Sequence, residues 1–144
     1  LHFTGYERAV ATIRLPEPSL RLLGSLLGSA DIIAQMSDRC YLEKCHDRLY
    51  PEFVDGGIAR RVTGTGEETV FASAEDLIRK TPGFFLSASK RLDHDLGGAW
   101  QYAREHFGGE NLYMDAVRRN IRFAEQLREG PSLVLRRVPP VTLN

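Results

Sequence analysis

Asp31, Gln35 and Asp38 are the residues of this 144-residue chain whose types and spacing most readily suggest chemistry. A helix turns by about 100° per residue, so it would carry all three along one polar stripe. Carboxylate oxygens bind divalent cations, but Asp31 and Asp38 would be roughly 10 Å apart along the axis, too far to share one ion easily. The residues alone leave two interpretations open: a metal-ligating Asp31, or the solvent face of an amphipathic helix.

The element that would carry this stripe is a helix that follows Pro16 and Pro18, is capped by Ser19 and extends far enough to include Asp38. Its apolar residues at helical spacing are Leu22, Leu23, Leu26, Ala30, Ile33 and Met36, and small residues interleave as Gly24, Ser25, Gly28 and Ser29. A helical glycine costs about 1 kcal/mol relative to alanine. We therefore expect a neighbouring helix to pack closely on Gly24 and Gly28.

Four further helical patterns complete an all-α prediction of about five helices. They run over 41–55 with a bend or restart at Pro51, over 74–96 from a Ser73 capping box with a restart at Thr81-Pro82, over 99–107, and over 112–129. Residues 1–15 are expected to be extended or looping, and 58–72 to form a surface loop with at most a short extended piece. The predicted organisation is one helical domain over residues 1–130 and a tail over 131–144.

Composition excludes several classes of protein. The chain has 19 Lys plus Arg and 19 Asp plus Glu, with 42% hydrophobic residues, which argues against disorder and gives no overall charge for nucleic acid or an anionic membrane. No apolar run approaches the roughly 20 residues of a membrane span. Cys40 and Cys45 are five residues apart, unlike a redox or zinc pair, so we expect reduced thiols in a cytoplasmic protein.

The stretch from Ala30 to Lys44 resembles a string in a bacterial branch of the HD-domain metal-dependent phosphohydrolases, Ala-Asp-x-x-x-Gln-Met-x-Asp-Arg-x-Tyr-Leu-Glu-Lys. Further pieces agree in the same order: residues 48–53, 76–81, 90–98 and 111–121. The likeness covers nearly the whole chain up to about Gly130. It implies a helical domain that hydrolyses a small phosphorylated substrate through water activated by one or two divalent cations of the Mn, Mg or Fe class.

The family's cations are held by an early His, a His-Asp pair and a late Asp, and the resemblance places the late Asp at Asp31. Gln35 and Asp38 are then candidates for residues that support this ligand or lie beside the substrate. His2 is a candidate for one of the family's additional histidines. The dipeptides His46-Asp47 and His94-Asp95 follow Asp31, whereas the family's pair precedes its late Asp, so we interpret both as chance occurrences.

These observations predict the C-terminal portion of an HD-type phosphohydrolase, inactive by itself because one metal ligand is too few. Leu rather than Met at position 1 fits the later part of a longer protein. We also expect a homodimer or higher oligomer, because such a portion would expose apolar surface. The alternative is a non-catalytic helical interaction or regulatory module, in which Asp31 is a polar surface residue.

Overall fold

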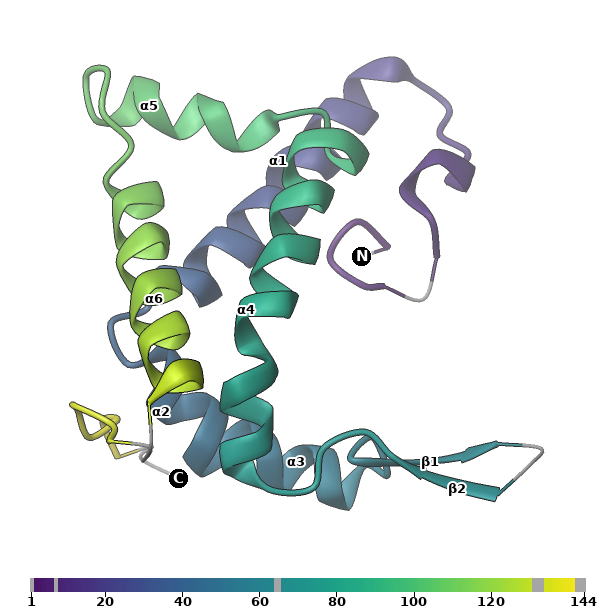
Figure 1. Ribbon diagram of the computed structural model, residues 1–144. Helices are drawn as coiled ribbons and strands as arrows, with labels where there is room; N and C mark the ends of the chain where they lie inside the picture. The colour runs from purple at the N-terminus through teal and green to yellow at the C-terminus, as the bar shows by residue number, and fades with distance from the viewer. Residues whose placement is uncertain (1, 7, 64–65, 131–133, 142–144) are drawn as a thin grey trace. The chain divides into compact units, whose positions relative to one another are not determined.

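The computed structural model describes residues 2–6, 8–63, 66–130 and 134–141, and helices dominate them, as predicted for an all-α chain (Figure 1). The α-helices are α1 (Pro18–Met36), α2 (Tyr41–Lys44), α3 (Tyr50–Asp55), α4 (Ala74–Lys90), α5 (Ala103–His106) and α6 (Leu112–Glu129). The strands are β1 (Arg60–Thr63) and β2 (Gly66–Thr69). The chain divides into two compact units, a first unit of residues 1–38 and 83–119 and a second unit of residues 39–82 and 120–144.

In the first unit, α1 begins with Pro18 after an extended Glu17 and buries mainly small residues and its C-terminal half. The buried residues are Ser25, Gly28, Ser29, Ile32, Ile33 and Met36. Leu22 and Leu23 are 45% and 59% exposed, so the N-terminal half of the predicted apolar face has no cover among the described residues.

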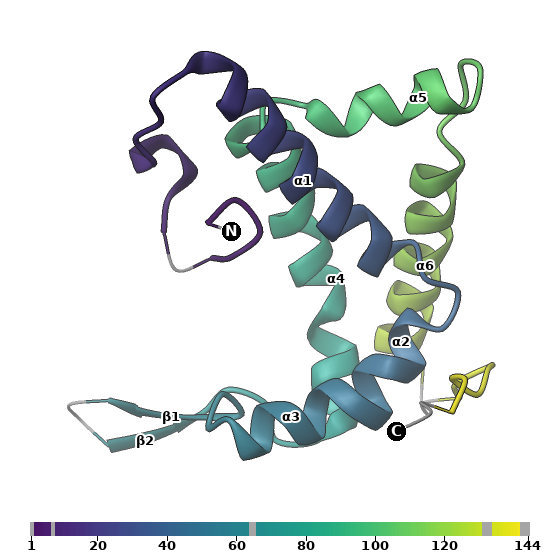
Figure 2. The ribbon, with the colours of Figure 1, turned by 180° about the vertical axis from the view of Figure 1, so that it is seen from behind.

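The prediction that a helix packs on Gly24 and Gly28 is wrong. The residue that lies closest to both glycines is Phe3, in the non-helical N-terminal segment. A Cβ built on Gly24 would lie 2.6 Å from the Phe3 ring, and one on Gly28 would lie 2.5 Å from the Phe3 carbonyl oxygen. The N-terminal segment His2–Tyr6 thus lies against α1 (Figure 2). Leu96 also approaches Gly28, at 3.1 Å from the built Cβ.

In the rest of the first unit, pairs of glycines lie at the turns between helical segments. α4 passes into a π-helical turn, Arg91–Asp95, which ends at Gly97 and Gly98, both with positive φ. A 3-10 turn, Ala99–Tyr102, leads into α5, and Gly108 and Gly109 then reverse the chain toward α6. The buried side chains of this region are Phe85, Ala88, Leu92, Leu96, Ala99 and Val117.

In the second unit, α2, a π-helical turn over Cys45–Leu49 and α3 follow one another directly, with Pro51 in the first turn of α3. The α-helix therefore restarts at Pro51, which is one of the two predicted alternatives. Its missing N–H falls where a helix start needs none, and the π-helical turn precedes it.

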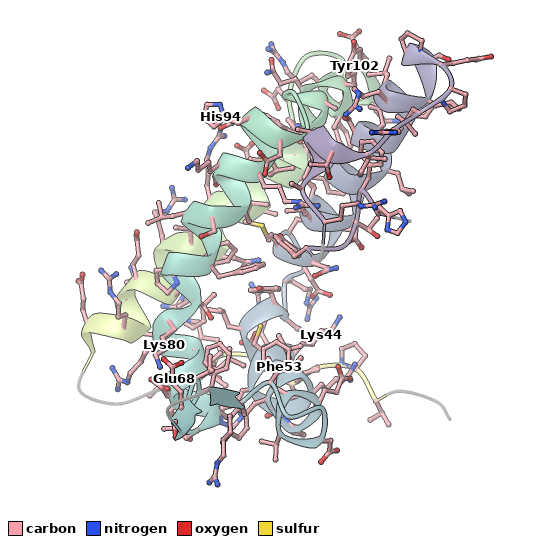
Figure 3. All side chains as sticks on the ribbon, turned by 90° about the vertical axis from the view of Figure 1, so that its right-hand side faces the viewer. Lys44, Phe53, Glu68, Lys80, His94 and Tyr102 are labelled. Carbon is pink, nitrogen blue, oxygen red and sulfur yellow. The ribbon has the colours of Figure 1, made fainter. Side chains whose placement is uncertain are left out.

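The predicted loop over 58–72 contains an antiparallel hairpin, with Arg60 opposite Thr69 and Thr63 opposite Gly66; residues 64–65 lie outside the described part. At its base, Phe53 of α3 stacks on Phe71 with ring centroids 5.6 Å apart, and Lys80 Nζ lies 5.6 Å from the Phe71 ring (Figure 3).

The start of α4 agrees with the predicted capping box, because the Asp76 N–H donates to Ser73 Oγ at 3.2 Å. The predicted restart at Thr81-Pro82 is wrong: α4 continues through Pro82. Thr81 Oγ1 donates to the Leu77 carbonyl at 3.0 Å, so the hydroxyl supplies a hydrogen bond to a carbonyl in the turn before the proline. Pro82 is also the last α4 residue of the second unit, which means that the sequence signal falls at a unit boundary.

Candidate functional site

Asp31 lies in the C-terminal half of α1, half-buried, and Gln35 lies one turn further on. Gln35 Nε2 donates to Asp31 Oδ1 at 3.1 Å. This bond joins the two residues at the helical i, i+4 spacing, at which side chains on one face meet. It orients the carboxylate and engages one of its two oxygens.

Tyr6 of the N-terminal segment interacts with Asp31 and with a buried arginine, Arg91, in the first unit. The Arg91 Cζ atom lies 4.3 Å from the centre of the Tyr6 ring. The pKa of Tyr6 is raised, mainly by burial, while the charge of Arg91 lowers it and the charge of Asp31 raises it. Tyr6 therefore lies within the electrostatic reach of both a carboxylate and a guanidinium.

Arg91 is 7% exposed, and main-chain carbonyl groups accept hydrogen bonds from its buried guanidinium. Its Nη2 donates to the carbonyl oxygens of Phe3 at 3.0 Å and of Gly5 at 2.6 Å. Among the described residues, Arg91 Nε and Ser29 Oγ are buried without a hydrogen-bond partner. A buried guanidinium without a paired carboxylate keeps a positive field in this part of the first unit.

The other predicted site residues take different places. Asp38 lies beyond the end of α1, and its N–H donates to the Gln35 carbonyl at 3.2 Å. His2 is exposed in the N-terminal segment. Within the described ranges, no group of three or more His, Cys, Asp and Glu side chains could hold a metal ion. Asp31 has the chemistry of one ligand of such a site, and the described residues do not supply the rest of a ligand set.

The two His-Asp dipeptides occupy exposed helical turns. In the second unit, His46 Nδ1 lies 2.7 Å from Asp47 Oδ1, and His46 Nε2 lies 3.4 Å from Glu75 Oε1 at the start of α4. The pKa of His46 is raised, first by its hydrogen bond with Asp47. His94 in the first unit is exposed and points outward from the helix (Figure 3).

A pocket of the first unit lies apart from Asp31. It has a volume of about 490 Å³ and is lined by Gly98, Gln101, Tyr102, Arg104, Glu105 and Gly109. None of the residues around Asp31 lines it. It is wide open and Arg104 Nε is already bonded to the Gly109 carbonyl at 3.1 Å, so we do not assign chemistry to it.

Comparison of the chain with protein-family models, with curated proteins and with solved structures found no match. In the described residues, the helices all fall short of the length and apolar character needed to cross a membrane. Cys40 and Cys45 are both buried.

Sequence reasoning placed Asp31 and Gln35 on one stripe but gave no sign of Tyr6 beside Asp31 or of Arg91 beside Tyr6. An arginine between helical residues looks like solvent-facing charge, and Arg91 reaches the N-terminal segment across more than eighty positions of sequence. The available signal is the position of Arg91, one residue before the buried Leu92.

Proposed function

We propose that this chain is the C-terminal segment of an HD-type metal-dependent phosphohydrolase in which Asp31 is the late metal-ligating aspartate. The observation that carries the proposal is the hydrogen bond from Gln35 to Asp31. Ligating carboxylates are held in orientation by such outer partners. The bond engages Oδ1 and so orients Oδ2 for a cation, the arrangement expected of a ligand supported from behind.

The N-terminal segment supports the same proposal. Tyr6 lies within electrostatic reach of Asp31, so this segment runs close to the carboxylate. In a longer protein, preceding chain would arrive beside Asp31 and would supply the early His and the His-Asp pair. Asp31 and those residues would hold a divalent cation, which would supply a hydroxide nucleophile at neutral pH and polarise the phosphoryl group.

The residues of this chain have separable roles in that proposal. Asp31 would ligate the cation, Gln35 holds the Asp31 carboxylate in place, and Arg91 holds the N-terminal segment through the Phe3 and Gly5 carbonyls. Asp38 and His2 are given no role in this proposal. Reduced, buried Cys40 and Cys45 fit a cytoplasmic enzyme.

The first test is the coding sequence upstream of Leu1. The proposal requires a His and, further along, a His-Asp pair there, and their absence would contradict it. The second test uses purified protein that includes those residues. Asp31→Ala should abolish bound Mn²⁺ and phosphatase activity, and Gln35→Ala should weaken Mn²⁺ binding by about 10- to 100-fold.

Asp95→Ala is the matched control for Asp31→Ala, because Asp95 is an exposed carboxylate of the first unit and belongs to a His-Asp dipeptide. It should leave Mn²⁺ content and activity unchanged. The 144-residue chain alone should show negligible turnover of p-nitrophenyl phosphate with Mn²⁺ or Mg²⁺. Robust turnover that disappears in Asp31→Ala would mean that a complete site lies within these residues.

A non-catalytic interaction or regulatory module is the second candidate, and the exposed leucines of α1 favour it. Leu20, Leu22, Leu23 and Leu27 are 39–59% exposed along one helix. Apolar surface of this kind marks interaction sites. Under either function it predicts a homodimer or higher oligomer, and sedimentation as a monomer at high concentration would count against that expectation.

A further inference from the structure

The C-terminal segment Val134–Val141 is held against the second unit by contacts along its length. Arg137 donates to the Arg39 carbonyl, and Arg48 donates to the Pro140 carbonyl. Cys40 Sγ lies 4.0 Å from the Val138 carbonyl oxygen, and Pro139 is buried. We call the residues that receive this segment the tail surface: Arg39, Cys40, Glu43, Arg48 and Phe123.

Glu43 is the centre of the tail surface. Its side chain is 2% exposed, and Oε1 accepts the main-chain N–H groups of Arg136 at 3.2 Å and of Arg137 at 3.0 Å. Among the described residues, the hydrogen bonds to this carboxylate come from the C-terminal segment. A buried carboxylate is costly without donors, so the surface is complete only when an extended segment supplies two consecutive N–H groups.

The remaining contacts select for particular side chains. The Arg136 Cζ atom lies 4.2 Å from the centre of the Phe123 ring, a cation–π contact. Pro139 and Pro140 have fixed φ angles and no N–H groups, which keeps the segment extended and leaves no main-chain donor to satisfy at the buried Pro139. The segment that fits therefore combines two basic residues with a following Pro-Pro.

We propose that the tail surface is a binding site for an extended, basic, proline-containing segment, and that the partner it fits is the C-terminal segment of a second copy of this chain. A second copy carries every recognised feature: the two N–H groups, the arginine that covers Phe123 and the buried proline. Exchange of identical terminal elements is a low-cost route to a dimer. The chain's own segment competes at an effective concentration in the millimolar range, so exchange is favoured when that segment is weakened.

The first experiment measures binding of a fluorescent peptide of residues 132–144 to the full 144-residue chain by anisotropy. The variant Arg137→Ala/Pro139→Gly weakens the chain's own segment but leaves the tail surface intact. It should bind the peptide at least about tenfold more tightly than the wild type. Adding Glu43→Gln should remove that gain, because a neutral amide is a weaker acceptor of both N–H groups.

A control peptide N-methylated at the amide of Arg137 keeps every side chain but lacks one of the N–H groups that Glu43 accepts. It should bind at least about tenfold more weakly than the unmodified peptide. Equal binding would show only general attraction of a basic peptide and would overturn the proposal. This control does not depend on the folding of a Glu43 variant.

The second experiment tests exchange between copies. Chains with Glu43→Gln have an intact segment and a damaged surface, and chains with Arg137→Ala/Pro139→Gly have the reverse. Mixed, they should form a 1:1 complex in sedimentation velocity beyond any association of either chain alone. Binding of the peptide without such a complex, or no peptide binding by the loosened variant, would overturn the assignment of the second copy as partner.

Discussion

Replacing Gly28 by alanine should destabilise the first unit, although helix propensity alone predicts the opposite. Alanine in the interior of α1 gains about 1 kcal/mol over glycine. The new Cβ would, however, lie 2.5 Å from the Phe3 carbonyl oxygen, a main-chain atom that cannot rotate away. That oxygen also accepts the hydrogen bond from Arg91 Nη2.

The size of the loss follows from what the Phe3 carbonyl holds in place. Phe3 is 5% exposed, and full burial of its side chain contributes about 1.5–3 kcal/mol. A hydrogen bond to a charged group contributes about 1.5–3 kcal/mol more. If the N-terminal segment leaves α1, both contributions are lost against a gain of about 1 kcal/mol, so the net destabilisation should be about 2–5 kcal/mol.

Urea unfolding, followed by circular dichroism and by fluorescence of Trp100 in the first unit, measures this change. Gly83→Ala is the matched control, because Gly83 lies inside α4 with no heavy atom within 4 Å of its built Cβ and no positive φ. It should stabilise the protein by up to about 1 kcal/mol. Gly24→Ala should fall between the two, because it meets the Phe3 ring, which can pivot. A Gly28→Ala protein at least as stable as the wild type would refute the close packing of Phe3 on α1.

Three further outcomes are expected in the second unit. The pKa of His46 is raised, first by its hydrogen bond with Asp47 and further by Glu75, so the stability that these contacts contribute is full below the ordinary value of 6.5 and is lost as pH rises through the folded pKa. His46→Gln should therefore flatten the decline in stability above pH 6.5, measured by urea unfolding across pH, and an unchanged slope would contradict the stabilisation of protonated His46 by its two carboxylate neighbours. Burial raises the pKa of Cys45 to about 11, so iodoacetamide at pH 8 should modify it at a useful rate only after unfolding. Arg79 Nη1 donates to three carbonyls at the end of α6, the shortest at 2.9 Å, so Arg79→Met should cost about 1–3 kcal/mol in urea unfolding.

Helix ends were predictable because the signals for them are local. The helical patterns predicted to end at residues 55 and 96 end at Asp55 and Asp95, each before a glycine pair, and positive φ at Gly57, Gly97 and Gly98 explains why glycine stands at those positions. The hairpin was expected only as a loop, because its two short, polar strands carry no alternation of apolar residues. Pro82 indicated a break, but a proline inside a helix is tolerated when other contacts offset its cost.

In the candidate site, too, the local contact could be predicted from sequence and the long-range contact could not. The Asp31–Gln35 bond follows from i, i+4 spacing, and any helix over these residues brings the two side chains together. The approach of Tyr6 and Arg91 depends on a tertiary contact between segments far apart in sequence. Hydrophobic periodicity carries no information about such a contact, because Arg91 bonds to carbonyl groups, which every residue has.

A buried charged side chain binds main-chain groups of each terminal segment. This explains why the packing of the two segments was not predicted from sequence, and it sets the effect on stability that we expect from removing them. Arg91 in the first unit donates to the carbonyls of Phe3 and Gly5, and Glu43 in the second unit accepts main-chain N–H groups of the C-terminal segment. Each charge is buried and has main-chain groups as its hydrogen-bond partners among the described residues. Removing either segment would leave a buried charge without these partners, so the loss of stability should exceed the value of the apolar area that the segment covers. Deletion of the segment together with neutralisation of the charge, Arg91→Met or Glu43→Gln, should then cost less than the sum of the two separate changes, a non-additivity that a double-mutant cycle measures directly.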